Sequence, residues 1–128
     1  YLLAVDRNNT RVADLYSAYH PSVLRAVRYV VNEVHRVGKT VSICGEMAGD
    51  PGTAILLMAM GFDSLSMSAS NLLKVRKTIC HTPLSEAKLL LDEVLAYDNP
   101  VQIRATVEAK LTALGLIDLI RPQGARAS

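Results

Sequence analysis

Tryptophan is absent from the sequence, phenylalanine occurs once, and aromatic residues make up 5% of the chain. The hydrophobic core must therefore be built from leucine, valine, isoleucine, alanine and methionine side chains. Hydrophobic residues account for 50% of the sequence and charged residues for 20%, which is the balance of an ordinary globular protein. At 128 residues, the chain is long enough for one domain with its own core and too short for two.

Cysteine is scarce as well, and no long hydrophobic run is present. Cys44 and Cys80 form no CxxC motif and lie in no cluster of histidines and cysteines with the spacing of a zinc site. The longest apolar run, residues 54–60, is far shorter than the ~20 residues that cross a bilayer, and no signal peptide is recognisable. We therefore expect a reduced, cytoplasmic protein with no membrane partner.

The net charge is small, at +2, and the excess of basic residues falls in residues 99–128. Two surplus charges without interleaved aromatic residues are a poor footprint for nucleic acid, so we expect no nucleic-acid partner. The sequence opens with Tyr1, within an apolar run over residues 1–5 that is typical of the inside of a structured segment. We therefore expect the chain to be a fragment of a longer protein.

Residues 21–37 show the clearest helical pattern in the chain. Pro21 suits the first position of a helix, and Gly38 suits the left-handed turn that ends one. Apolar residues recur at spacings of three and four and so predict one buried face. The residues of this predicted face are Val23, Leu24, Val27, Val30, Val31 and Val34.

Residues 40–67 predict alternating strands and helices. Residues 40–44 alternate like a strand, and residues 62–67 read as a second short strand. Between them, Asp50 is placed to cap a helix over residues 51–60, which is apolar almost all round and is therefore expected to be deeply buried. Strand, helix and strand in this order are the pattern of parallel β/α units.

Most of the remaining sequence predicts helices, at residues 70–80 (starting at Ser70 or Asn71), 83–97 and 101–114. We expect order to about residue 121 and a loose tail over residues 122–128. The fold class predicted is therefore α/β, as a single domain region over residues 1–128 that is rich in helices and has short parallel strands.

Residues 44–51, Cys-Gly-Glu-Met-Ala-Gly-Asp-Pro, are the most informative segment for chemistry. Cys44 ends a predicted parallel strand, which is where β/α folds place active sites, but a free cysteine is equally often a small buried hydrophobic residue. As a site residue, Cys44 is either a proton donor or a nucleophile. Glu46 disfavours a thiolate and no histidine is close in sequence, so proton donation is the better of the two roles.

Arg7 is the second candidate, because the planar fork of a guanidinium group suits phosphate and carboxylate oxygens. It follows the apolar run at the start of the chain. By spacing alone, a local salt bridge to Asp6 or Asp14 is the more frequent role for such an arginine.

Four segments occur in the same order as in a known family. They are residues 3–8 (Leu-Ala-Val-Asp-Arg-Asn), 20–21 (His-Pro), 44–51 and 60–68 (Met-Gly-Phe-Asp-Ser-Leu-Ser-Met-Ser). Through nearly its whole length, the chain thus resembles enzyme I of the bacterial phosphotransferase system, the phosphoenolpyruvate-protein phosphotransferases. The Asn8-Asn9 pair and the segment at residues 115–122 resemble the nitrogen-regulatory branch more than the sugar-transport branch.

The resemblance implies a TIM-type (β/α)8 barrel that binds phosphoenolpyruvate and Mg²⁺, of which this chain would be roughly the C-terminal third. It implies a kinase-like transferase that moves the phosphoryl group of phosphoenolpyruvate to an enzyme histidine and on to a small phosphocarrier of the HPr type, leaving pyruvate. Carried over to this sequence, Cys44 would be the catalytic general acid toward the enolpyruvate carbon, and Arg7 would bind the substrate phosphate.

Other parts of the family's site have no counterpart in this sequence. The Asn-Asp motif that supplies a metal ligand would lie before Tyr1, together with a further metal carboxylate, two more phosphate-binding arginines and the phosphorylated histidine. We therefore expect no metal ligand among these residues, and an isolated fragment that is inactive.

Two other interpretations follow from the same residues. The fragment would act mainly as a dimerisation module, since members of the family form homodimers through this domain. Alternatively, it would be related to pyruvate phosphate dikinase or phosphoenolpyruvate synthase, although their Cys-Gly-Glu motif is expected to continue with His-Gly, where this chain has Met47-Ala48.

Overall fold

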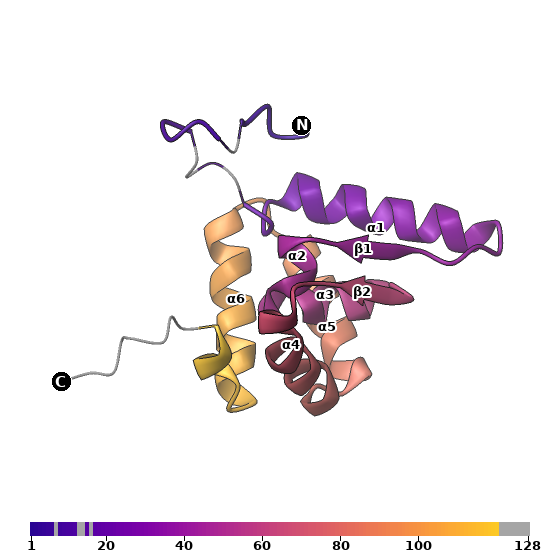
Figure 1. Ribbon diagram of the computed structural model, residues 1–128, viewed down its shortest axis with the longest axis vertical. Coiled ribbons are helices and arrows are strands. Elements are labelled where there is room, and N and C mark those ends of the chain that lie inside the picture. The colour runs from indigo at the N-terminus through magenta and orange to yellow at the C-terminus, as the bar shows by residue number, and fades with distance from the viewer. Residues whose placement is uncertain (7, 13–14, 16, 121–128) are drawn as a thin grey trace.

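The computed structural model describes residues 1–6, 8–12, 15 and 17–120. This part of the chain is a helix-rich α/β structure with two short strands, as expected from the sequence (Figure 1). In chain order, its elements are α1 (Pro21–Arg36), β1 (Ser42–Cys44), α2 (Glu46–Gly49), α3 (Pro51–Met60), β2 (Ser64–Ser66), α4 (Ala69–His81), α5 (Leu84–Leu95), α6 (Pro100–Ala113) and the 3-10 helix η2 (Ile117–Leu119).

The two strands pair in parallel, with Ser42 opposite Ser64, Ile43 opposite Leu65 and Cys44 opposite Ser66. Helices α2 and α3 form the crossover connection. They carry the chain from the C-terminal end of β1 back to the end at which β1 began, as a parallel pair requires. Both strands are shorter than the sequence predicts, because only three residues of each take part in the ladder.

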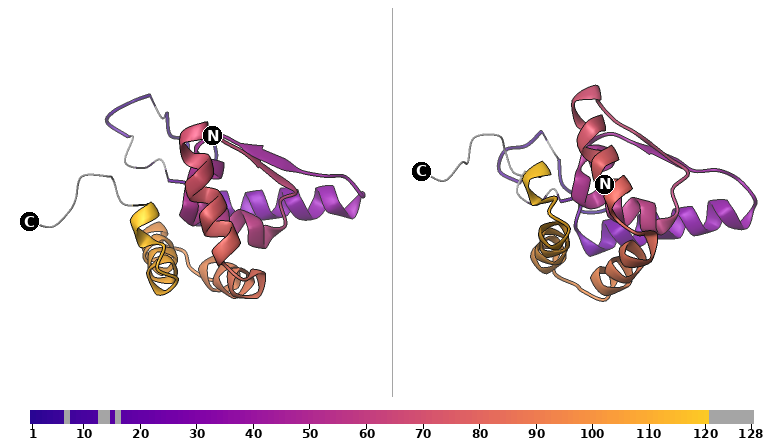
Figure 2. Two further views of the ribbon diagram at one scale, coloured as in Figure 1. Left: turned by 60° about the horizontal axis from the view of Figure 1, so that its bottom comes forward. Right: turned by 90° about the horizontal axis from the view of Figure 1, so that it is seen from below.

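Helix α3 is the centre of the core. All of its residues except Met58 are buried, which confirms the burial expected from its all-round apolar sequence. The helix contacts α4, α5 and α6, and Figure 2 shows α5 and α6 next to each other. Ile43 and Leu65 pack against the same cluster from the strands, so the strand pair is held by its apolar side.

Local signals place the ends of α1 as predicted. Pro21 is the first residue of the helix, and the ring of His20 accepts a hydrogen bond from the Ser22 N–H at 3.2 Å. At the other end, Gly38 has a φ of +69°. The Gly38 and Lys39 N–H groups donate to the carbonyl oxygens of the last helical turn, which closes the helix in a Schellman-type motif.

Three local features differ from what the sequence predicts. Helix α4 begins at Ala69, before the predicted caps Ser70 and Asn71. Residues 46–49, between the predicted strand and the predicted helix, form the one-turn helix α2, which the sequence pattern does not predict. Val30, assigned to the buried face of α1, is 50% exposed, because α1 contacts the other helices mainly through α5 and its apolar stripe is wider than that contact.

His35 and Asp63 form a clamp at the start of the two strands. His35 Nε2 lies 2.9 Å from Asp63 Oδ2. The same carboxylate oxygen accepts a hydrogen bond from the Val41 N–H at 2.7 Å. The hydrogen bonds from His35 and Val41 lower the pKa of Asp63, so this carboxylate stays ionised and ties α1 to both strands.

The predicted tail at residues 122–128 lies outside the described residues. Among the residues that the structure describes, no helix combines the length and the apolar character needed to cross a membrane.

Candidate functional site

Cys44 is the last residue of β1, at the C-terminal end of a parallel strand, as the sequence predicts. Its side chain is exposed, so the interpretation as a small buried hydrophobic residue is wrong for this structure. Gly45 follows with φ +89° and ψ −158°, a conformation that essentially only glycine adopts. The chain therefore turns away directly after Cys44 and leaves the thiol uncovered at the strand end.

The segment after Cys44, which consists of Gly45, helix α2 and Asp50, is bonded to the start of α3. Asp50 caps this helix as predicted, because its Oδ2 accepts a hydrogen bond from the Thr53 N–H at 2.8 Å. The hydroxyl of Thr53 in turn donates to the carbonyl oxygens of Met47 and Asp50. The residues between the strand and the long helix are thus bonded to the helix that forms the core.

Small polar side chains occupy the exposed face of the strand pair. Ser42 and Cys44 of β1 are exposed, as are their partners Ser64 and Ser66 of β2, whereas Ile43 and Leu65 between them are half-buried. Cys44 and Ser66 are register partners, and partners in a parallel pair project to the same face. Ser66 therefore lies beside Cys44 at the same strand ends. Sequence analysis missed it, although the alternation of residues 64–66 was a visible signal.

The N-terminal segment lies close to the segment after Cys44. Leu3 and Val5 border a pocket that also includes Ala18 and Met47, which belongs to α2. Arg7, the predicted phosphate ligand, lies outside the described residues. Nearby, Asp6 Oδ1 accepts a hydrogen bond from the Asn8 N–H at 2.9 Å.

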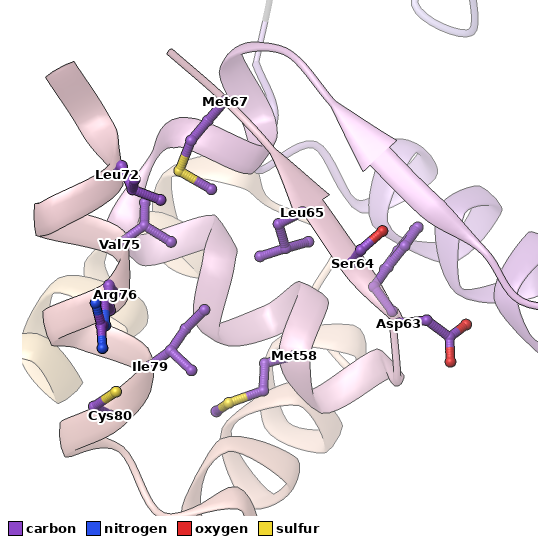
Figure 3. Close-up of a pocket in the computed structure, with 11 residues that line it drawn as sticks. Met58, Asp63, Ser64, Leu65, Met67, Leu72, Val75, Arg76, Ile79 and Cys80 are labelled. Atoms are coloured by element: carbon purple, nitrogen blue, oxygen red, sulfur yellow. The ribbon is translucent and has the colours of Figure 1, made fainter. Parts of the chain in front are cut away.

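A groove on the other side of the strand pair lies between β2 and α4 (Figure 3). Its lining is mainly apolar, with Leu65, Leu72 and Ile79 toward the centre and Arg76 as a basic residue at the side. Cys80 also lies on this groove and is exposed. An apolar groove with one arginine does not suit a small, highly charged phosphate ester, so the strand ends around Cys44 are the better candidate site.

No group of three or more histidine, cysteine, aspartate or glutamate side chains is arranged to hold a metal ion within the described part of the chain. The residues around Cys44 and Ser66 bring thiol and hydroxyl groups together with one carboxylate nearby, Glu46. This set provides hydrogen-bond donors and acceptors and a thiol proton, rather than the oxygen cage that Mg²⁺ requires.

Comparison with known proteins identifies the family. Residues 1–84 match the family described as "PEP-utilising enzyme, PEP-binding domain". A protein from Salmonella typhimurium named "Phosphoenolpyruvate-dependent phosphotransferase system" is 37% identical over 121 residues, which are 94% of this chain and 16% of that protein. The "Phosphoenolpyruvate-protein phosphotransferase" of Listeria monocytogenes is 43% identical over 113 residues, covering 88% of this chain and 20% of the relative.

The protein of the same name from Haemophilus influenzae is 39% identical over 108 residues, which are 84% of this chain and 19% of the relative. The chain thus spans no more than a fifth of the length of these relatives. The family match covers well over half of the chain and includes both Cys44 and the strand pair. The chain belongs to the family of PEP-utilising enzymes, and residues 1–84 are part of the PEP-binding domain of that family.

Proposed function

We propose that this chain is the C-terminal part of the phosphoenolpyruvate-binding domain of a phosphoenolpyruvate-protein phosphotransferase. The observation that carries the proposal is the exposed Cys44 thiol at the C-terminal end of β1, in a sequence that is 43% identical to a phosphotransferase. The whole enzyme moves the phosphoryl group of phosphoenolpyruvate to one of its own histidines and then to a small phosphocarrier of the HPr type. Both the acceptor histidine and the carrier lie outside this chain.

In the proposed reaction, Cys44 acts as the general acid. The bond between phosphorus and the enol oxygen breaks, the phosphoryl group goes to the acceptor histidine, and the enolate form of enolpyruvate remains. Cys44 Sγ then gives its proton to the methylene carbon of enolpyruvate, the enol oxygen becomes the carbonyl oxygen of pyruvate, and solvent reprotonates the thiolate. The exposed hydroxyl of Ser66 beside Cys44 supports a polar setting for this transfer.

The fold of the whole domain is proposed to be a TIM-type (β/α)8 barrel. Two observations support it. The strands are parallel neighbours joined through helices, and their apolar side chains face the helical core while their small polar side chains face away. In such a barrel, the polar side would face the interior, and Cys44 would lie at the C-terminal end, where barrel enzymes carry their active sites.

Mg²⁺ is proposed to bind in the whole enzyme through carboxylates that lie outside this chain. The described residues do not fit a metal site by themselves, because they contain no suitable cluster of ligands. No step of the chemistry assigned to this chain therefore passes through the metal.

The binding test compares the 128-residue chain with a longer protein that includes the upstream part of the domain. We expect phosphoenolpyruvate binding, measured by calorimetry, only in the longer protein, because this chain carries only Arg7 as a candidate phosphate ligand. Absence of binding to the longer protein in the presence of Mg²⁺ would remove the proposed function.

Arg7 is proposed to bind the substrate phosphate. In the full-length enzyme, Arg7→Lys keeps the positive charge but loses the two-pronged hydrogen bonding of the guanidinium group, so the Kd for phosphoenolpyruvate should rise by about tenfold, the loss of about one charged hydrogen bond. Arg11→Lys is a control on the same segment. An unchanged Kd for Arg7→Lys would return Arg7 to the role of a salt-bridge partner.

Three finer proposals accompany this function. The nitrogen-regulatory branch is favoured by the Asn8-Asn9 pair and the segment at residues 115–122. A cytoplasmic location is proposed because the proposed substrate is phosphoenolpyruvate and the proposed partner is a small phosphocarrier of the HPr type. Pyruvate is the expected product that leaves the site.

Self-association is proposed as a second role of this region. Several helices expose large apolar side chains, and two of them expose adjacent pairs, namely Tyr29 and Val30 on α1 and Leu72 and Leu73 on α4. The strand pair also has open edges within the described structure, and exposed edges and apolar surface promote association. We expect the isolated chain to sediment as a dimer or larger species at micromolar concentration, and a monomer across that range would contradict this role.

A further inference from the structure

Tyr19 connects two segments that are far apart in the sequence. Its side chain is almost completely buried, at 8% exposed, and its hydroxyl donates a hydrogen bond of 2.6 Å to Asp50 Oδ2, 31 residues away. Burial and the negative charge of Asp50 both raise the pKa of Tyr19 far above its ordinary value. The phenol therefore remains a hydrogen-bond donor at any physiological pH.

Asp50 carries the effect of this contact toward Cys44. Its Oδ2 is the same atom that caps α3 through the Thr53 N–H, so Tyr19 fixes the rotamer of the capping carboxylate. Thr53 then holds the carbonyl oxygen of Met47, which lies three residues after Cys44. A continuous series of hydrogen bonds thus runs from Tyr19 to the segment that follows the thiol.

The surroundings of Tyr19 are shaped for its hydroxyl as well as its ring. A Cβ atom on Gly52 would lie 2.3 Å from the Tyr19 hydroxyl oxygen, so only glycine leaves room for it there. On the other side, the Arg104 guanidinium lies 5.8 Å from the ring centroid, in range of a cation–π contact. Arg104 of helix α6 therefore contacts the ring, while the hydroxyl donates its hydrogen bond to Asp50.

Tyr19 also belongs to the segment that leads from the N-terminus into α1. The Tyr19 N–H donates a hydrogen bond to the Ser17 hydroxyl oxygen at 3.2 Å, and the neighbouring residue His20 caps α1. Ser17 and Ala18 border the pocket that Leu3 and Met47 also line. The contact from Tyr19 to Asp50 therefore joins the N-terminal segment to the segment after Cys44.

We propose that Tyr19 is a positioning residue, which holds the segment at residues 45–49 (Gly45 and helix α2) through Asp50 so that the Cys44 thiol is aimed at the enolpyruvate carbon. This role rests on the proposed function. A purely structural tyrosine would contribute through its ring alone. The two roles separate in Tyr19→Phe, which keeps the buried ring and its contact with Arg104 but removes the hydroxyl.

The test uses the full-length enzyme and measures pyruvate formation from phosphoenolpyruvate. For Tyr19→Phe we expect kcat to fall about tenfold, because small displacements of a catalytic group slow proton transfer, while KM stays within about a factor of two. Tyr97→Phe is the matched control. It loses a similar bond, from the Tyr97 hydroxyl to Glu93 Oε1 at 2.8 Å, but Tyr97 is a half-buried residue just after α5 and the acceptor of its hydroxyl lies on α5 rather than on Asp50 or α3, so kcat should not change.

A double-mutant cycle tests whether Tyr19 acts through Asp50. Asp50→Asn retains a side-chain oxygen that can cap α3, so the fold should be kept. If the two residues act as one unit, the double variant should lose no more kcat than the more affected single variant, whereas independent residues would multiply their losses.

An additional readout does not depend on catalysis. In the full-length protein, alkylation of Cys44 by iodoacetamide, followed by peptide mass spectrometry with Cys80 as the internal reference, should become faster in Tyr19→Phe because the segment at residues 45–49 is looser. An unchanged Cys44-to-Cys80 ratio together with an unchanged kcat would overturn the positioning role, as would multiplied losses in the cycle or an equal loss in Tyr97→Phe. If the wild-type enzyme forms no pyruvate, the proposed function fails, and the alkylation ratio then decides alone whether Tyr19 holds this segment.

Discussion

Cys44→Ala in the full-length enzyme is expected to slow pyruvate formation by ~10²–10⁴, the usual range for the loss of a general acid. The Kd for phosphoenolpyruvate and the melting temperature should hardly change, because Cys44 is exposed and supports no packing in the described structure. Only the proton delivered to the enolpyruvate carbon is lost. The rate of pyruvate formation is measured in a stopped-flow instrument through a coupled reaction that reduces the pyruvate.

Cys80→Ala is the matched control, since Cys80 is also an exposed free cysteine but lies on α4, at the apolar groove. Near-normal turnover of Cys44→Ala would exclude the general-acid role. A phosphorus- or pyruvate-containing adduct on Cys44 of the wild-type enzyme, detected by mass spectrometry during turnover, would show that the cysteine is a nucleophile instead.

Asp50→Ala should lower the free energy of unfolding by about 2–4 kcal/mol. Loss of the helix cap contributes about 1 kcal/mol, and the buried Tyr19 hydroxyl, left without its acceptor, contributes about 1–3 kcal/mol more. The geometric basis is that one carboxylate oxygen serves both Thr53 and Tyr19. Urea unfolding followed by circular dichroism measures the difference.

Asn99→Ala is the matched control for this stability change. Asn99 caps α6 by accepting a hydrogen bond from the Val101 N–H at 2.9 Å, but it is exposed and holds no second buried donor. Asn99→Ala should therefore lower the free energy of unfolding only by the contribution of the helix cap, about 1 kcal/mol. Equal losses in the two variants would mean that the Tyr19 contact adds nothing to stability.

The features that the sequence predicted depend on neighbours along the chain. Proline and glycine at the ends of α1, the Asp50 cap and the all-round apolar character of α3 are local signals, and each is confirmed. The position of Cys44 at a strand end followed from the same kind of reasoning, because the alternating run over residues 40–44 lies between Gly38 and Gly45.

The features that the sequence did not predict are contacts between distant residues. Tyr19 meets Asp50 across 31 residues, and His35 meets Asp63 across 28 residues. Neither pair has a characteristic spacing, because each contact depends on how segments that are far apart in the sequence pack together. Ser66 was missed for a related reason, since its place beside Cys44 depends on the register between β1 and β2.

The roles of Cys44 and Arg7 come from resemblance rather than from composition or periodicity. An exposed thiol at a strand end is compatible with several reactions, and the spacing around Arg7 alone favours a local salt bridge. The match of residues 1–84 to a family described as a PEP-binding domain supports the proposal that both residues act on one substrate in the whole enzyme.

Transfer of labelled phosphate tests the central claim most directly. The full-length enzyme is incubated with phosphoenolpyruvate labelled with ³²P, Mg²⁺ and a small phosphocarrier of the HPr type. The proposed function predicts acid-labile, histidine-linked label first on the enzyme and then on the carrier, with one pyruvate formed for each phosphoryl group transferred. Pyruvate formed without label on any protein histidine, or no consumption of phosphoenolpyruvate at all, would contradict it.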